Sequence, residues 1–271
     1  MVTFVSTRTG FKDESNFYRT HLNLDELRRV IAEREQAVVS AHQTGERQAE
    51  RQALERLGTD YWALGEPERA IECYERVLNI AHASGDRRSE ASALNSLGAI
   101  YWALDRPRLA VDRHKRALAI ARRIGDRREE SRALSNLGNA CTALNEMQRA
   151  VKLYEEALPI ARKVADEHGE AELLGNLGAA YYSVGEPQRA VEYCEQALAA
   201  FEKIGDRPKV GMALWNFSLA LDELGEHAQA IARMEVALAI FEQTDHPHRV
   251  KAQQLLARWR QPSPKWWRFW A

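Results

Sequence analysis

Four glycines that lie 40 residues apart constrain the fold of this chain more than any other feature (98 − 58 = 40). Most of them stand in the pattern Leu-Gly-x-x-Tyr, and a small residue follows nine positions after the Tyr position. Self-similarity at a fixed period of this length indicates a repeat protein. The repeat positions are, in order, Gly58, Gly98, Gly138 and Gly178, and Ser218 takes the fifth.

Each repeat has the pattern of two helices joined by a short turn. Leu57, Gly58 and Tyr61 fall on one face of a first helix, because they are one, three and four residues apart. The sequence Gly65-Glu66-Pro67 then ends that helix and starts the next, since Gly tolerates the left-handed conformation and Pro suits a first helical turn. Gly58 and Ala70 are small enough for the two backbones to approach closely. The sequence therefore predicts a helical hairpin for each repeat.

The recurring pattern Leu54-x-x-Leu57-Gly58-x-x-Tyr61 with Ala70-x-x-x-Tyr74 resembles the tetratricopeptide repeat family. The usual period of that family is about 34 residues, whereas it is 40 here (98 − 58). The longer variant is similar to the repeats of kinesin light chains, of Pins-type spindle adaptors and of sensor regions in bacterial signalling ATPases. The resemblance implies an all-α, right-handed α-solenoid of antiparallel helix hairpins that binds peptides or proteins and catalyses nothing.

The repeat register divides the chain into segments. We expect an irregular N-terminal arm over 1–12, a degenerate capping repeat over 13–47 with a helix from Leu24 to His42, a C-terminal capping helix over 247–260, and a Trp-rich tail over 261–271. Degenerate ends are typical of solenoids, because a terminal repeat faces water on one side. The five clear repeats are 48–87, 88–127, 128–167, 168–207 and 208–246.

Composition and charge exclude several classes of protein. The formal net charge is −1, from 38 Lys and Arg against 39 Asp and Glu, which argues against a general nucleic-acid binder. Three cysteines do not make a disulfide framework in a chain this long; we expect Cys141 and Cys194 to be buried and Cys73 to be half-exposed. Neither a long apolar run nor the features of a signal peptide are present, so we expect a cytoplasmic protein.

The sequence contains none of the common motifs for catalysis or for metal binding. It has no His-Glu-x-x-His, no paired Cys-x-x-Cys, no Gly-rich phosphate loop and no Gly-x-Ser-x-Gly. Carboxylates such as the pairs Glu129-Glu130 and Glu155-Glu156 lie among arginines at helical spacing, which is typical of a solvated helix face. We therefore predict no catalytic residue, no metal ligand and no cofactor.

A binding surface is predicted along the first helix of each repeat. Its members, which we call the inner stripe, lie six, three and two residues before the repeat glycine and one and four residues after it. Three successive repeats carry Asn at the position two before the glycine, and an amide can both donate to and accept from the main chain of an extended peptide. Peptide-binding members of the long-repeat families use Asn at this place, so the resemblance implies the same role here. The predicted binding residues are Trp62, Asn95, Trp102, Arg132, Asn136, Asn139, Asn176, Tyr182, Trp215 and Asn216.

Two structural alternatives to peptide contact stay open at this stage. The three Asn side chains could instead tie neighbouring first helices together, and each aromatic side chain of the inner stripe could pack between helices. With peptide contact, the chain is an adaptor for a protein or peptide client. A regulatory or inhibitory subunit of a partner enzyme or toxin is the second candidate, with binding as its means.

The C-terminal tail belongs to no repeat and is rich in tryptophan. Burying one large aromatic side chain is worth about 2–3 kcal/mol, so we expect the tail to dock on a protein surface, which includes another copy of the chain. Packing against its own last helices and entry into a membrane interface are the alternatives, and the last of these corresponds to a membrane-associated scaffold. The predicted docking residues are Trp266, Trp267, Phe269 and Trp270.

Overall fold

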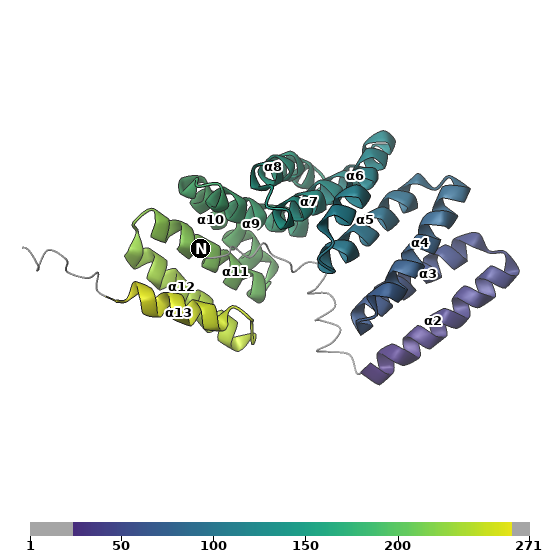
Figure 1. Ribbon diagram of the computed structural model, residues 1–271, viewed down its shortest axis with the longest axis horizontal. Coiled ribbons are helices and arrows are strands. Elements are labelled where there is room, and N and C mark those ends of the chain that lie inside the picture. The colour runs from purple at the N-terminus through teal and green to yellow at the C-terminus, as the bar shows by residue number, and fades with distance from the viewer. Residues whose placement is uncertain (1–23, 262–271) are drawn as a thin grey trace, which may run out of the picture. The chain divides into compact units, whose positions relative to one another are not determined.

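The computed structural model describes residues 24–261, and the regular elements among them are all α-helices (Figure 1). Within this described part, no helix has the length and apolar character that crossing a bilayer requires. The helices are α2 (Leu24–Thr44), α3 (Arg47–Leu64), α4 (Pro67–Ser84), α5 (Arg87–Ala103), α6 (Pro107–Ile124), α7 (Arg127–Ala143), α8 (Met147–Lys163), α9 (Glu167–Ser183), α10 (Pro187–Ile204), α11 (Arg207–Glu223), α12 (His227–Gln243) and α13 (Arg249–Trp259).

From α2 to α8 and from α9 to α13, consecutive helices pack against each other, which confirms the predicted all-α solenoid class. The chain forms two compact units: the N-terminal unit ends at Val164 and the C-terminal unit begins at Ala165. The helices α2 to α8 pack in series in the first unit, and α9 to α13 do so in the second (Figure 1). The expected arm over 1–12, the first part of the degenerate repeat up to residue 23 and the tail residues 262–271 lie outside the described residues. The last helix, α13, begins at Arg249, two residues after the predicted start of the capping helix.

The repeat glycines lie where the two helices of a hairpin are in closest contact. A Cβ atom on Gly98 would lie 2.5 Å from Cε1 of His114, which occupies the aromatic position of the second helix. The same atom on Gly58 would lie 2.9 Å from the ring of Tyr74. Real Cβ contacts are longer than this, so a side chain at either position would require the facing ring or the helices themselves to move. The glycine spacing therefore sets the hairpin geometry.

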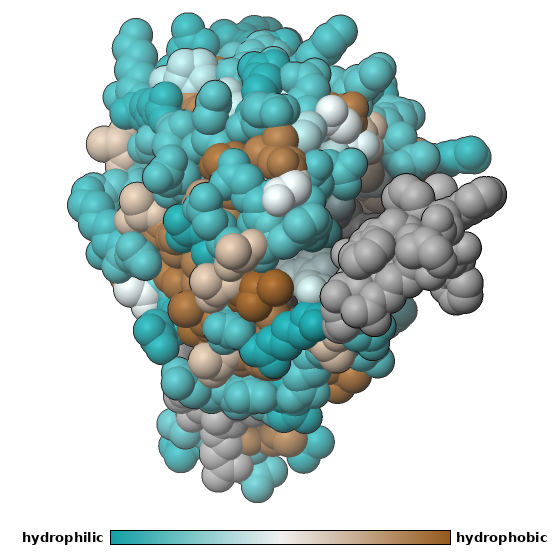
Figure 2. Space-filling view, turned by 90° about the vertical axis from the view of Figure 1, so that its left-hand side faces the viewer, coloured by the Kyte–Doolittle hydropathy of each residue, from teal (hydrophilic) through white to brown (hydrophobic). Residues whose placement is uncertain are grey.

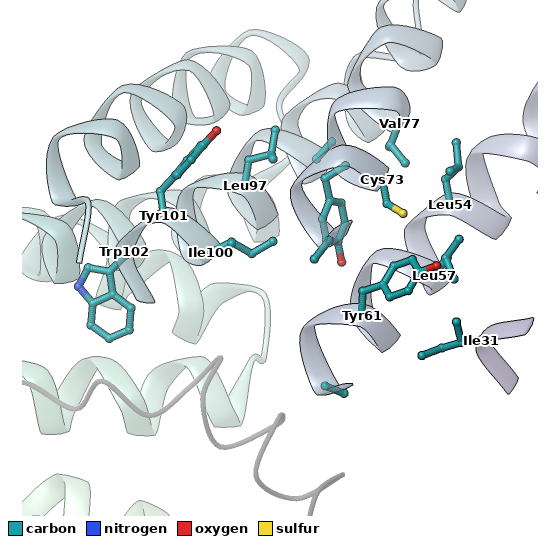
Figure 3. Close-up of a cluster of buried hydrophobic side chains, with 14 of the residues drawn as sticks. Ile31, Leu54, Leu57, Tyr61, Cys73, Val77, Leu97, Ile100, Tyr101 and Trp102 are labelled. Carbon is teal, nitrogen blue, oxygen red and sulfur yellow. The ribbon is translucent and has the colours of Figure 1, made fainter. Parts of the chain in front are cut away.

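The core of the N-terminal unit is built from the repeat positions of successive hairpins (Figure 3). Leu57 and Tyr61 of α3 lie beside Ile31 of α2, so the degenerate N-terminal helix covers the first complete hairpin. Cys73 of α4 is buried in the same cluster, which corrects the expectation that it is half-exposed. Cys141 and Cys194 are buried as predicted, and burial raises the pKa of both thiols, to about 11 for Cys141 and to about 12 for Cys194.

At three places in the N-terminal unit, a buried glutamate at the start of one helix binds a side chain from the end of the preceding helix. These contacts join α2 to α3, α4 to α5 and α6 to α7, and we call each of them a Glu junction. At the second junction, Glu90 accepts from Arg87 at 2.5 Å and contacts His82 Nδ1 at 3.2 Å. Burial raises the pKa of Glu90, but the hydrogen bonds from Arg87 and His82 outweigh it and lower the pKa overall. The equivalent residues are His42, Arg47 and Glu50 in the first junction and Arg122, Arg127 and Glu130 in the third.

The prediction of a solvated face is wrong for Glu129 and Glu130, which are both buried. Glu155 and Glu156 are exposed, as predicted. A charged carboxylate tolerates burial when it is paired and fully hydrogen-bonded. The arginines near Glu129 and Glu130 in sequence are the partners that make this burial possible.

The connections between repeats use the left-handed backbone conformation at one residue. Gly125 has φ +70°, and Gly85 and Gly205 take the same conformation. Ala165 takes it as well, with φ +52°, although an L side chain is unfavourable there. The next residue, Asp166, accepts from the Gly169 N–H at 3.0 Å and so caps α9. The capping geometry is therefore kept at this connection without the glycine.

The face of the molecule drawn in Figure 2 is mostly hydrophilic, with hydrophobic residues gathered to the left of its middle. Val236 of α12 and Val250 of α13 are each 52% exposed. The buried side of α13 is formed by Ala252 and Leu256, and Trp259 packs against the core residues Phe217 and Leu221.

Candidate peptide-binding face

The inner stripe is not uniformly accessible. Asn95, Trp102, Asn176, Trp215 and Asn216 are buried. The other five predicted binding residues keep solvent contact: Arg132 is exposed, and Trp62, Asn136, Asn139 and Tyr182 are half-buried. The predicted tail residues Trp266, Trp267, Phe269 and Trp270 lie outside the described residues.

Asn95 belongs to a polar network inside the second hairpin. It is 2% exposed, and its Oδ1 lies 2.7 Å from Nδ1 of His114. Because an amide oxygen only accepts, Nδ1 of His114 donates in this bond. The Asn95 amide nitrogen in turn donates to Glu129 Oε1 at 2.5 Å. Asn95 therefore joins α5 to α6 and α7, and its hydrogen bonds are directed at these helices instead of at a ligand.

Burial makes the histidine of this network a permanent neutral donor. Burial and the nearby charge of Arg132 lower the pKa of His114 to about 3. His114 occupies the position that Tyr74 and Tyr154 hold in neighbouring repeats. Asn95 supplies the acceptor that this substitution requires, so the two residues form one structural unit.

Asn139 is held from two sides. Tyr154 donates its hydroxyl to Asn139 Oδ1 at 2.7 Å, and Trp102 donates its indole N–H to the Asn139 backbone carbonyl at 3.2 Å. Trp102 thus packs between α5 and α7, which is the alternative that the sequence left open for the aromatic members. These bonds fix the inner stripe of α7 relative to α5.

Trp215 is a core residue of the C-terminal unit. It is 3% exposed and contacts the rings of Phe241 at 6.2 Å and His248 at 5.4 Å. Asn95 occupies the same position, three residues before the repeat position, and it is buried as well. The contacts of both side chains are therefore made inside the fold.

The three Asn residues of the predicted row differ in their surroundings. No hydrogen bond from the Asn136 side chain to any described residue is present, and this side chain is half-buried. Asn216 is buried, and its Oδ1 has no hydrogen-bond partner between residues 24 and 261. Asn176 is buried and takes part in an interaction. The amide of Asn136 in particular keeps its hydrogen-bonding capacity for a ligand.

Arg132 lies one turn from Asn136 on α7 and is held in place by its neighbours. Glu129 Oε2 lies 2.6 Å from one guanidinium nitrogen, and the same nitrogen donates to Ser92 Oγ of α5 at 3.1 Å. The side chain of Arg132 is about half exposed. A guanidinium fixed at one end can still donate from its other nitrogens to a carboxylate or a carbonyl.

Among residues 24–261, no three His, Cys, Asp or Glu side chains come together as a metal site would require. Ser92 is itself a member of the inner stripe but is not among the predicted binding residues, and the sequence analysis missed that Ser92 and Glu129 position Arg132. The signal for Ser92 was its place in the stripe 40 residues before Arg132 (132 − 92 = 40).

Comparison with known proteins agrees with this architecture. The family model described as "Tetratricopeptide repeat" matches residues 49–123, 89–163 and 169–243. A search of curated proteins gives no match.

Solved structures with the same fold include BtubC (BKLC) from P. vanneervenii, at 21% identity and a TM-score of 0.72, over 88% of this chain and 95% of that chain. The apo form of the quorum sensor NprR from B. thuringiensis matches at 17% identity and a TM-score of 0.70, over 96% and 73%. The Rap conjugation gene regulator of plasmid pLS20, in complex with the Phr* peptide, matches at 18% identity and a TM-score of 0.63, over 82% and 62%. Identities this low show the shared fold alone.

Proposed function

The chain belongs to the tetratricopeptide repeat family, and from this premise we propose that it is a non-catalytic adaptor that binds a segment of a partner protein on the inner stripe of its N-terminal unit. The observation that carries the proposal is the Asn136 amide, which is solvent-accessible and makes no hydrogen bond within the described chain. An extended peptide presents one N–H and one C=O per residue, and an amide satisfies both.

The surroundings of Asn136 support a polypeptide ligand. Arg132 offers a charged donor one helical turn away, and Ser92 and Glu129 hold it in place. Asn139 is fixed by Tyr154 and Trp102, so the surface beside Asn136 is rigid. A rigid polar surface binds with a small loss of conformational entropy. In the C-terminal unit, Tyr182 is the half-buried aromatic candidate.

Selection of a random peptide library against the intact protein tests the proposal, because such a selection does not require an identified client. The dissociation constants of the selected peptides are then measured by fluorescence anisotropy for the wild type and for Asn136→Ala. We expect Asn136→Ala to weaken binding about five- to tenfold, the equivalent of a hydrogen bond of about 1–1.5 kcal/mol.

Asn79→Ala on α4 is the matched control, because Asn79 is exposed and lies outside the inner stripe. Both variants should melt within about 2 °C of the wild type, since surface substitutions cost little. Selected peptides that bind wild type and Asn136→Ala equally well would place the ligand elsewhere and refute the proposal.

A regulatory role is the second candidate. Two proteins of this fold, the quorum sensor NprR and the Rap conjugation gene regulator, carry regulatory names, and the second was solved with a peptide. For this chain, regulation would use the same peptide-binding face, with a change in the activity of the client as the output. Assay of the client with and without the chain separates a regulator from an adaptor. A membrane-associated scaffold depends on tail residues outside the described part.

A further inference from the structure

Helix α6 differs from the other second helices in its charge. Between Pro107 and Ile124 it carries six basic residues and a single acidic one, Asp112. Its buried side consists of Ala110, His114, Ala117, Leu118 and Ala121, so the basic residues share the remaining faces. The basic residues are Arg108, Arg113, Lys115, Arg116, Arg122 and Arg123.

Most of these cations are not neutralised by the protein. Arg122 pairs with Glu130 and with Glu156, and Arg113 lies 5.8 Å from the ring centroid of Tyr101. The other four are exposed, and no ion pair joins them to any residue between 24 and 261. They are Arg108, Lys115, Arg116 and Arg123, and we call them the α6 cations. Their spacing of seven, eight and fifteen residues from Arg108 places them along one face of the helix.

The neighbouring repeats carry acidic residues at the position equivalent to Lys115, and these residues limit how wide a partner of the α6 cations can be. The residues 40 positions before and after Lys115 are Glu75 and Glu155, and both are exposed. A membrane or a nucleic-acid duplex that covered several second helices would meet these carboxylates as well as the α6 cations. A partner as narrow as one polypeptide segment can lie along α6 and avoid them.

The chemistry of the α6 face favours a polypeptide over a single nucleic-acid strand. Proteins that bind single strands combine cations with aromatic side chains on which bases stack, whereas α6 has no Phe, Tyr or Trp. Its exposed apolar side chains are aliphatic: Leu109 is 46% exposed and Ile124 is 39% exposed, one near each end of the helix. Leu109 and Ile124 can pack against apolar side chains of a protein segment that also contains acidic residues.

We propose that the outward face of α6 is a second docking surface, separate from the inner stripe, and that it binds an acidic segment of a partner protein. The α6 cations attract the carboxylates of the segment, and Leu109 and Ile124 contact its apolar side chains. This surface is independent of the proposed peptide-binding face, so the two can be occupied at the same time or by different partners.

Titration of the full chain with fluorescein-labelled poly-L-glutamate, followed by anisotropy, tests the proposal. Wild type should bind, and the affinity should fall as salt is raised, because the contact is electrostatic. The double substitution Lys115→Glu with Arg116→Glu should weaken binding by about tenfold or more. Arg108→Ala with Arg123→Ala serves as a second variant that removes charge without reversal, in case the first one fails to fold.

The double substitution Lys251→Glu with Arg258→Glu on α13 is the matched control, because it changes the net charge equally at exposed residues. This control should weaken poly-L-glutamate binding by less than about threefold. Asn136→Ala should leave the affinity for poly-L-glutamate unchanged. Equal losses in the α6 and α13 variants would show an effect of net charge alone and overturn the proposal. Absence of poly-L-glutamate binding would also overturn the proposal. The same holds if poly(U) or phosphatidylserine vesicles bind more tightly than poly-L-glutamate and lose that binding in the α6 variants.

Discussion

Gly98→Ala should destabilise the protein although alanine is the better helix former. The new Cβ would lie 2.5 Å from Cε1 of His114 and 2.7 Å from both ring nitrogens. Carbon atoms in contact prefer about 3.5–4 Å, so the ring must retreat by about 1 Å. His114 is 1% exposed and bonded to Asn95, so no open space receives it. The clash must therefore be relieved by separating α5 from α6 or by breaking the buried hydrogen bond.

The size of the effect follows from these contacts. Overpacking of a tight core costs about 1–3 kcal/mol, and loss of the bond to Asn95 leaves buried polar groups unpaired at a cost of about 1–3 kcal/mol. Alanine recovers about 1 kcal/mol of helix propensity. The net loss in the free energy of unfolding is about 3 kcal/mol, which for a chain of this size lowers the melting temperature by about 6–12 °C.

Gly175→Ala is the matched control for Gly98→Ala, because a Cβ there would meet Phe201 at an ordinary 3.5 Å. It should raise stability by up to about 1 kcal/mol. Thermal melts followed by circular dichroism compare the two variants with the wild type. A melting temperature for Gly98→Ala at or above that of the wild type would refute the packing argument. The cost of Gly98→Ala should also shrink in a His114→Ala background, and an unchanged cost would show that the ring is not the obstacle.

Three further predictions rest on single residues. Because the folded-state pKa of Glu90 is below its ordinary value of 4.5, its stabilising contribution is present above that value and is lost as the pH falls through the folded-state pKa. Glu90→Gln should therefore lower the melting temperature at neutral pH and flatten its decline as the pH falls below about 4.5; parallel pH profiles would contradict this. Ala165→Gly should stabilise by about 0.5–1 kcal/mol, because glycine removes the strain of a positive φ, and an unchanged urea midpoint would show that no strain exists. Cys194, buried with a pKa of about 12, should resist alkylation in the folded protein and react after unfolding; fast labelling of the native state would show that its pocket opens.

The sequence predicts the fold well because the hairpin contacts are encoded at fixed offsets within one repeat. Gly58 and Tyr74 touch across the hairpin, and so do Gly98 and His114. The period and the small residues therefore carry most of the information. The Glu junctions were missed because a carboxylate beside arginines in sequence resembles a solvated surface pattern, and only packing shows that Glu90 is enclosed by its partners.

The candidate site could be predicted only in part. Members of the inner stripe occupy the same positions relative to the repeat glycine, but the side chains around them differ between repeats. How deeply each member is buried depends on those surrounding side chains. Asn95 is internal because His114 replaces a tyrosine one helix away and needs its amide oxygen. The Asn136 amide makes no hydrogen bond because no described residue presents a donor or acceptor to it. Periodicity assigns a residue to a helix face, whereas its partners depend on the residue types that the next helix presents.

The uniform register of the Glu junctions has a consequence for how this chain can change in length. Removal of residues 88–127, one complete 40-residue block (127 − 88 + 1 = 40), would place His82 and Arg87 opposite Glu130 with the spacing they now have to Glu90. The shortened chain should therefore fold with the same helix content per residue by circular dichroism. That block also contains all of α6 and its cations. A repeat protein built on such junctions can lose, gain or exchange one charged outer surface as a single block, while the Glu junction between the flanking repeats keeps its residue types and spacing.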